Sequence, residues 1–224
     1  AGPRRLAYVH TPTAAHYWHS VPAGADSTGR PGNVFAHALI DRWAAQPGDR
    51  PIERWRSPHW LCPFGAAAVA RASLPATAPT PAGVVSRDSV VAFLFDPTTW
   101  RMDTLFGLLD AVAAAMSGGR PVVLGATSPD SAAQWIGLIS FLMSPATAAT
   151  LNFTTFDRVE AIGQALHAGY HVIAVPVCDL DAVDHHTLVV IDETAAVGMN
   201  LGVGGGMFAV FVPDDESMSM VHTF

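Results

Sequence analysis

The stretch Pro121-Val122-Val123-Leu124-Gly125, with the Ser128-Pro129-Asp130 that follows it, decides the fold class of this 224-residue chain. Its first five residues form a continuous apolar run, as expected for a strand buried on both faces of a sheet. Ser128 then fits a helix N-cap and Pro129 fits a first helical turn, which predicts a helix running to about Met143. A buried strand that leads into a helix indicates a parallel sheet with crossover helices.

The same alternation continues on both sides of this unit. Further strands are expected at residues 90–95, 151–156, 171–175, 188–191 and 207–212. Further helices are expected at residues 103–116, with Asp103 as N-cap and Gly118-Gly119 as the stop, and at residues 157–167. The predicted fold class is therefore α/β, with an irregular, strand-containing N-terminal part followed by a mostly parallel sheet with flanking helices.

The N-terminal part reads less regularly. Short strands are expected at residues 6–10 and 17–21, a strand or a buried helix at 34–41, and a helix at 63–73 that starts near Pro63. Residues 74–83 contain three prolines, which favour extended geometry and forbid a helix. We therefore predict one domain at residues 1–73, a linker at 74–83 and an α/β domain at 84–224.

Residues 27–40, STGRPGNVFAHALI, place two glycines and a proline ahead of an apolar run. Gly29 and Gly32 permit a positive φ, and Pro31 fixes its own φ while pushing the preceding residue toward extended geometry. This density of conformationally special residues predicts a turn with one fixed shape.

Three polar side chains accompany this turn, namely Arg30, Asn33 and His37. Buried Asn and His side chains mostly satisfy nearby backbone groups, so we expect Asn33 and His37 to hydrogen-bond to neighbouring main chain. The alternative is a binding site formed by all three residues, because a shaped loop beside polar groups can also hold a ligand.

Three blocks of this chain resemble a known family. Residues 27–41 are similar to the "SGRPGN-aromatic-AHAL" signature of the actinobacterial GTPase-associated protein one family. Residues 50–60, RPIERWRSPHW, and the block from Trp135 to Arg158 are similar to two further segments of that family, in the expected order. The resemblance implies parts of the family's second-type N-terminal domain and of its middle domain.

By this resemblance the chain is a non-catalytic adaptor, encoded beside GTPases in bacterial conflict systems. The resemblance assigns no catalytic residue. It implies partners that are proteins, among them a GTPase encoded nearby.

Composition excludes or disfavours several classes. The net charge is −7, and no more than two arginines are adjacent, which disfavours a nucleic-acid binder. Charged residues make up only 14% of the chain and hydrophobic residues 50%, so some surface is expected to be covered by a partner or by further chain. Two cysteines give no disulfide framework and fit a reducing compartment.

No membrane span is expected, because the longest apolar stretch, residues 105–116, is short and contains Asp110. The chain starts at Ala1 without a charged-then-apolar leader, and the missing Met suggests a fragment. The expected location is cytoplasmic.

Residues 187–193, TLVVIDE, have the form of a Walker B strand, in which Asp192 would hold Mg²⁺ and Glu193 would orient water. That chemistry also needs a phosphate loop ending in lysine, and the chain contains no lysine. The glycines at 202–206 lack the third dinucleotide-binding glycine, whose place is taken by Met207. No cofactor is therefore predicted.

Histidine and cysteine approach metal-ligand spacing in three places: His16 with His19, His59 with Cys62, and Cys178 with His185 and His186. None supplies four ligands at the spacing of structural zinc, and no HExxH motif is present. No metal site is predicted.

The sequence and the resemblance together predict an adaptor or scaffold that acts through protein contacts in a GTPase-linked bacterial system. The alternative is an enzyme, because open α/β sheets place ligands at the carboxyl ends of their strands. The catalytic candidates are Asp192, Glu193, His185 and His186, with Asp96 expected near another strand end. A clustered acid–histidine set would favour the enzyme, and a dispersed one the adaptor.

Overall fold

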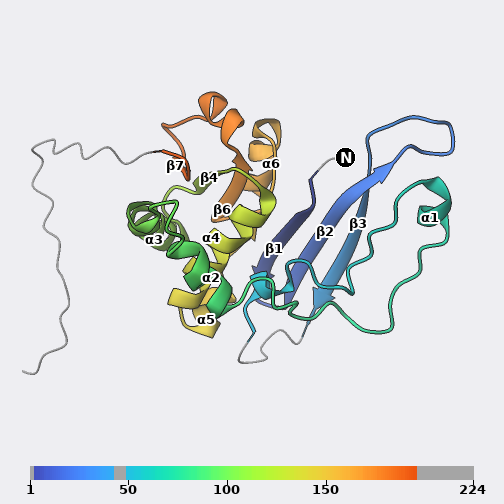
Figure 1. Ribbon diagram of the computed structural model, residues 1–224, viewed down its shortest axis with the longest axis horizontal. Helices are drawn as coiled ribbons and strands as arrows, with labels where there is room; N and C mark the ends of the chain where they lie inside the picture. The colour runs from blue at the N-terminus through green and yellow to red at the C-terminus, as the bar shows by residue number, and fades with distance from the viewer. Residues whose placement is uncertain (1–2, 43–48, 196–224) are drawn as a thin grey trace, which may run out of the picture.

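One mixed sheet of seven strands runs through both halves of the chain in the computed structural model, which describes residues 3–42 and 49–195. The strand order is β3-β2-β1-β5-β6-β4-β7 (Figure 1). The antiparallel strands are β1 (Arg5–Thr11), β2 (Ala14–Gly24) and β3 (Asn33–Asp41). The parallel strands are β5 (Phe153–Thr154), β6 (Val172–Pro176), β4 (Val122–Ala126) and β7 (Val189–Asp192). This arrangement confirms the α/β fold class.

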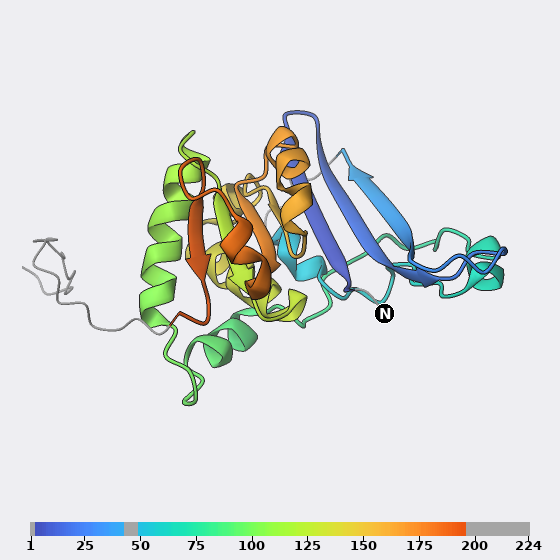
Figure 2. The same cartoon turned by 90° about the horizontal axis from the view of Figure 1, so that it is seen from above.

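Helices cover both faces of the sheet. Buried residues of α2 (Arg87–Leu94), α3 (Met102–Met116) and α4 (Pro129–Leu142) share one core cluster with β1, β4 and β6. A second cluster, on the opposite face, joins α6 (Ile162–His167) and the 3-10 helix η3 (Val177–Ala182) to β1, β4 and β6. In Figure 2, α3 lies beside β7 at one end of the sheet, and β3 lies at the other end.

The antiparallel strands follow the alternation of buried and exposed side chains. One face of β2 carries Tyr17, His19 and Val21, which are buried, and Trp60 stacks on His19 from a later segment. The strands expected at 6–10 and 17–21 are confirmed, and residues 34–41, for which strand and helix were both open, form β3.

The elements that carried the fold prediction are also confirmed. Ser128 is the N-cap of α4, and its Oγ accepts a hydrogen bond from Ser131 N at 3.0 Å. Helix α3 ends before Gly118, whose φ of 87° favours glycine. Strands β4, β6 and β7 lie where they were expected, while the strand predicted at 151–156 shortens to the two residues of β5.

The strand predicted at residues 90–95 is wrong, because this run belongs to helix α2. Ser86 caps the helix, since its Oγ accepts a hydrogen bond from Ser89 N. Val90 and Leu94 are buried one helical turn apart against α4, whereas Phe95 is exposed. A short apolar run fits a buried strand and a buried helix equally well, and the serine cap is the signal that separates them.

Three helix boundaries also differ from the prediction. Arg101 is the N-cap of α3, and Asp103 lies in its first turn. The helix expected at 63–73 contracts to α1 (Ala66–Ala70), and the helix expected at 157–167 begins with the 3-10 turn η2 (Val159–Ala161). The strand expected at 207–212 and the glycines at 202–206 lie outside the described residues.

A single segment, residues 50–56, holds both ends of α4. Arg50 donates from Nε to Ser140 O at 2.7 Å and from Nη2 to Met143 O at 3.2 Å, at the C-terminal end of the helix. Trp55 Nε1 and Arg56 Nε donate to Asp130 Oδ1 in the first turn of the same helix, at 2.8 and 2.6 Å. The 3-10 helix η1 (Pro51–Arg54) lies between these contacts, so the segment attaches the antiparallel strands to α4.

The division at residues 74–83 stays a prediction. The second half of this stretch is anchored, because Arg54 Nε donates to Pro79 O and Ala82 N donates to Glu53 O, both at 3.0 Å. Residues 74–78 are mostly exposed, and Leu74 is 75% exposed.

Limited proteolysis tests this division. We expect elastase to cut first within residues 74–78, because exposed backbone without anchoring contacts is cleaved most readily. Mass spectrometry of the first fragments locates the cut. First cuts within α2 or β4 would show that the boundary is misplaced.

The pair His19 and His37 offers a second test of the core. Both rings contact Trp60, but His37 Nδ1 accepts a hydrogen bond from Leu61 N at 3.1 Å, whereas neither ring nitrogen of His19 has a partner. We expect His19→Phe to raise the free energy of unfolding by about 1 kcal/mol, and His37→Phe to lower it by about the same amount. Denaturant unfolding of both variants measures the difference. A loss of stability in both variants would contradict the conclusion that the His19 ring has no hydrogen-bond partner.

The stability of this core is also expected to depend on pH. Burial, with smaller contributions from Arg4 and His37, lowers the pKa of His19 from 6.5 to about 3. Below pH 6.5 the unfolded chain binds a proton there that the folded chain does not, so stability falls as the pH decreases toward 3. The His19→Phe variant should lose less stability between pH 6 and pH 4 than the parent chain, measured by unfolding at a series of pH values.

Candidate functional site

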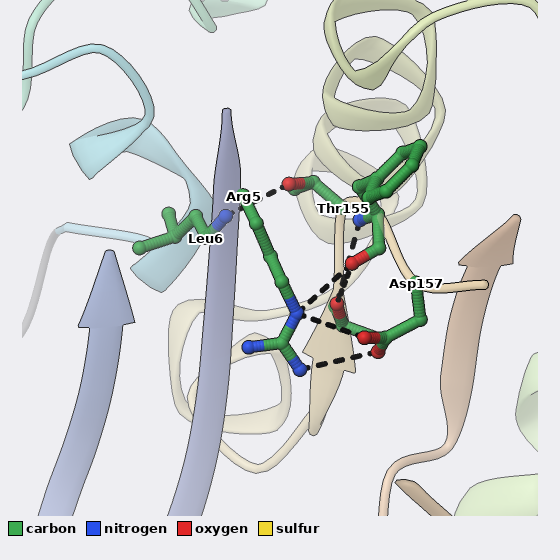
Figure 3. Close-up of polar contacts among 6 residues, drawn as sticks. Arg5, Leu6, Thr155 and Asp157 are labelled. Atoms are coloured by element: carbon green, nitrogen blue, oxygen red, sulfur yellow. Dashed lines mark hydrogen bonds and ion pairs between the residues drawn. The ribbon is translucent and has the colours of Figure 1, made fainter. Parts of the chain in front are cut away.

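The candidate site forms where the antiparallel and parallel parts of the sheet meet. Strands β1 and β5 pair over only two positions, Ala7 with Thr154 and Tyr8 with Phe153. Leu6 extends the pairing, because its N–H donates to Thr155 Oγ1 and its carbonyl accepts from Thr155 N, both at 2.9 Å (Figure 3). The chain leaving β5 is thereby held against β1.

An ion pair closes this junction. Arg5 donates from Nε to Asp157 Oδ1 at 3.0 Å and from Nη2 to Asp157 Oδ2 at 3.1 Å, and Nε also reaches Phe156 O at 2.9 Å (Figure 3). Such a two-point contact fixes direction as well as distance. Residues 156–158 therefore lie in a fixed position beside the end of β1.

A cleft of about 620 Å³ opens next to this ion pair. One wall is formed by the β2–β3 connection and the first residues of β3, and the other by the segment between β5 and α6. Its lining includes Pro22, Gly32, Asn33, Val34, Phe64, Phe156, Asp157 and Arg158. The cleft is therefore apolar in its walls and charged at one side.

The charged side consists of two ion pairs. Arg158 lies at the cleft with a side chain that is 57% exposed, and its guanidinium forms a two-point contact with the buried Asp179, at 2.7 and 3.0 Å. The side-chain hydrogen bond from Arg158 lowers the pKa of Asp179. Arg5 and Asp157 pair with each other in the same way, so both guanidinium groups at the cleft already hold a carboxylate.

The β2–β3 connection is organised by Asp26. Its Oδ1 accepts hydrogen bonds from Thr28 Oγ1 at 2.6 Å, from Thr28 N at 2.9 Å and from Arg30 N at 3.0 Å. The hydrogen bond from the Thr28 hydroxyl is the largest cause of the lowered pKa of Asp26, followed by those from the backbone. This loop has one shape because a single carboxylate gathers its N–H groups.

The turn predicted at residues 29–32 is confirmed. Gly29 and Gly32 have φ values of 85° and 88°, in the region that favours glycine. Asn33 Nδ2 donates to Arg30 O at 2.8 Å and to Gly24 O at 3.3 Å, so it closes the loop onto the end of β2. Gly24, with a φ of 78°, also leaves room for Phe64, whose ring would lie 3.1 Å from a Cβ at that position.

The three candidate binding residues do not gather in one place. Asn33 lines the cleft, and Arg30 lies on the exposed loop beside it. His37 is buried instead, at the edge of the Trp60 ring and bonded to the Leu61 N–H. The hydrogen bonds of Asn33 and His37 to backbone are those that the sequence predicted.

The acid–histidine set is dispersed. His185 and His186 precede β7, and their carbonyl oxygens face Arg120 near the start of β4, whereas Asp192 and Glu193 lie at the carboxyl end of β7. Asp96 follows helix α2, so its expected place at the end of a strand is wrong. The two histidines and the two acids therefore lie at opposite ends of β7 and do not form one cluster.

Glu193 has a structural role at the start of α4. Its carboxylate accepts hydrogen bonds from Thr127 N, from Ser131 Oγ and, at 2.7 Å, from Trp135 Nε1. The N-terminus of a helix after a parallel strand is where many α/β proteins bind a phosphate. Here the carboxylate of Glu193 lies near that position and is held by one backbone N–H before the helix and by two side chains of the helix.

The histidine and cysteine pairs do not form a metal site. His16 and His19 are three residues apart on β2 and face opposite sides of the sheet, so they cannot share an ion. Across residues 3–42 and 49–195, no three His, Cys, Asp or Glu side chains are grouped so that they could hold a metal. The same ranges contain no helix that is both long and apolar enough to span a membrane.

Asp26, Phe64 and Arg5 were missed by sequence reasoning. Asp26 has a local signal, because an aspartate followed two residues later by threonine and then by glycine is typical of a side-chain-stabilised turn. Arg5 and Phe64 have none, since each reaches the cleft through contacts with residues distant in the sequence.

Comparison with known proteins identifies the two walls of the cleft as parts of one family. Residues 1–79 match the GTPase-associated protein 1 N-terminal domain of type 2, and residues 93–195 match the GTPase-associated protein 1 middle domain. The chain belongs to the GTPase-associated protein 1 family. The family resemblance predicted from the three sequence blocks is thereby confirmed.

Two curated relatives come from strains of Mycolicibacterium smegmatis, and both are provisionally named ESX-1 scaffolding and assembly protein SaeB. The chain is 64% identical to that of strain MKD8 over 82% of its own length, and 60% identical to that of strain ATCC 700084 / mc(2)155 over 92%. It spans 22% and 25% of the lengths of these relatives. No solved structure gives a significant match.

Residues 26–33, which carry part of the family signature and are called the motif loop below, can be tested for their shape at Gly32. A Cβ there meets no atom within 4 Å, so a substitution is opposed by the backbone conformation alone. We expect Gly32→Val to lower the free energy of unfolding by about 1–2 kcal/mol, since left-handed geometry is costly for β-branched residues.

Gly32→Asn is the matched control, because asparagine tolerates this conformation, and it should cost less than half as much. Chemical denaturation of both variants measures the two values. Equal losses of stability in the two variants would show that the added side chain, rather than the positive φ of Gly32, causes the destabilisation.

Proposed function

We propose that this chain is a partner-binding module of a scaffold protein, and that its cleft holds a segment of another protein. The observation that carries the proposal is the convergence of both family regions on one cleft: the motif loop lies on one wall and residues 156–158 on the other. The scaffold role itself is supported by the names of the relatives.

The lining of the cleft indicates the chemistry of its ligand. Val34 and Phe64 are 66% and 65% exposed, so a bound segment could bury two large apolar side chains of the cleft. Arg158 lies at the opposite wall, with its guanidinium already bound to Asp179. These walls suit an apolar side chain of the bound segment, because aromatic residues are frequent anchors of protein interfaces.

The finer parts of the proposal concern the setting. We place the module in the cytoplasm of an actinobacterium, in a GTPase-linked system, with a GTPase encoded nearby or a component of an ESX-1-type machine as the bound protein. The family description supports the link to a GTPase, and the names of the relatives support the ESX-1 setting. The conflict-system role rests on the family resemblance alone.

Site-specific photo-crosslinking tests the cleft. We expect benzoylphenylalanine at position 64, in the full-length protein in its native cell, to form an adduct with one defined protein that mass spectrometry identifies. Position 95 is the matched control, because Phe95 is also 65% exposed but lies at the end of α2, away from the cleft.

Substitution provides the second arm. Phe64→Glu should reduce co-purification of that protein at least about tenfold, equivalent to about 1.4 kcal/mol, while Phe95→Glu should retain it. Both variants are expected to melt like the parent, since both rings are largely exposed. Adducts at position 95 and none at position 64 would overturn the proposal.

A further inference from the structure

Strand β3 forms one edge of the sheet and exposes an apolar face. Its neighbour β2 pairs with one side of it, and within the described residues no strand pairs with the other. Val34 and Ile40 are 66% and 56% exposed, and Ala36 and Ala38 between them are also exposed. The alternate residues of β3 face the opposite way, toward Trp60 and its segment.

This apolar face continues onto β2. Trp18 lies opposite Ala38 and is 36% exposed, and Pro22 lies opposite Val34. On the same face of the sheet, the cluster that contains α6 includes residues of β1, β4 and β6, among them Ala7, but none of β2 or β3. The surface over β2 and β3 is therefore open among the described residues.

The exposed edge of β3 lacks the features that natural proteins use to prevent strand pairing. Between Asn33 and Asp41, β3 contains no charged residue and no proline. The one register shift between β2 and β3 lies beside the first residues of β3, between Pro22 and Gly24 of β2. An edge of this kind is a template for another strand. It is therefore suited to pairing with a strand of matching side chains.

The sequence of β3 matches itself when reversed. Residues 34–40 read VFAHALI, so an antiparallel copy centred on His37 places Ala36 opposite Ala38, Phe35 opposite Leu39 and Val34 opposite Ile40. Each pair joins side chains of similar size, and no like charges meet. A two-fold interface requires this self-complementarity, because the same patch serves both partners.

We propose that a second copy of this chain pairs with β3, antiparallel and about a two-fold axis through His37, so that two sheets become one. The edge N–H and C=O groups of both strands then find partners, and the apolar strips of the two copies become continuous. The central ring is fixed before pairing, since Leu61 N already holds His37 Nδ1. This interface shares Val34 and Pro22 with the cleft, but its strand pairing requires no ligand there.

A charge exchange tests the pairing. The parent chain should show a concentration-dependent monomer–dimer equilibrium by analytical ultracentrifugation between about 1 and about 200 µM. Ala36→Glu with Ala38→Glu places like charges directly opposite each other across the axis, as does Ala36→Lys with Ala38→Lys, and each double variant should dimerise at least about tenfold more weakly. A mixture of the two double variants should restore a heterodimer.

Controls separate loss of pairing from loss of fold. Ala113→Glu with Ala114→Glu changes two exposed alanines of α3 by the same amount and should leave the dimer intact. Circular dichroism melts of all variants should match the parent. Three results would overturn the proposal: a chain that stays monomeric, a chain that forms open-ended oligomers, or a dimer whose affinity does not change with the charges on β3. Each would indicate that the edge of β3 pairs, if at all, with a strand from another protein.

Crosslinking tests the register. In a background with Cys62→Ser and Cys178→Ser, a mixture of Val34→Cys and Ile40→Cys chains should crosslink between copies with a short thiol reagent. Either variant alone should not, because its two thiols would lie about 20 Å apart, six residues along paired strands. Crosslinking of Val34→Cys with itself would indicate a parallel or shifted pairing and would overturn the two-fold centred on His37.

Discussion

The pairing of β1 with β5 is the contact on which the rest of the architecture depends. It covers two residues of backbone ladder, and the side chains of Thr155 and Asp157 lengthen it by bonding to Leu6 and Arg5. Through it an antiparallel unit and a parallel unit share one sheet. Because the cleft takes one wall from each unit, its width is set by this junction rather than by either unit alone.

Helix α4 provides the second constraint between the two units. Arg50 donates hydrogen bonds to carbonyl groups at the C-terminal end of α4. Asp130, in the first turn of α4, accepts hydrogen bonds from Trp55 and Arg56. Each charge is placed where the helix dipole favours it, with the carboxylate at the N-terminus and the cation at the C-terminus. The family block at 50–60 is therefore explained as an attachment between units, with no binding role required for Arg50 or Trp55.

The limits of sequence reasoning follow from the range of each interaction. The start of α4 could be predicted from Ser128 and Pro129 because helix capping involves residues that are neighbours in the sequence. The turn could be predicted from Gly29 and Gly32 because φ is a local property. The strand prediction for residues 90–95 was wrong because a short apolar run is compatible with both a buried strand and a buried helix. The cleft itself was not predictable, since Arg5 and Asp157 are 152 residues apart in the sequence.

The position of Glu193 supports the proposal that the cleft beside the antiparallel strands, rather than the carboxyl ends of the parallel strands, is the binding surface. In an open parallel sheet, the donors at a helix N-terminus beside a strand end are the usual place for an anionic ligand. At α4 the carboxylate of Glu193, which sequence reasoning linked to catalysis, lies near this position and accepts hydrogen bonds from Thr127 N and from the Ser131 and Trp135 side chains. A site filled from within the chain stabilises the fold and offers little to a ligand. Val34 and Phe64, by contrast, are exposed apolar side chains whose burial by a ligand would be favourable, and both line the cleft.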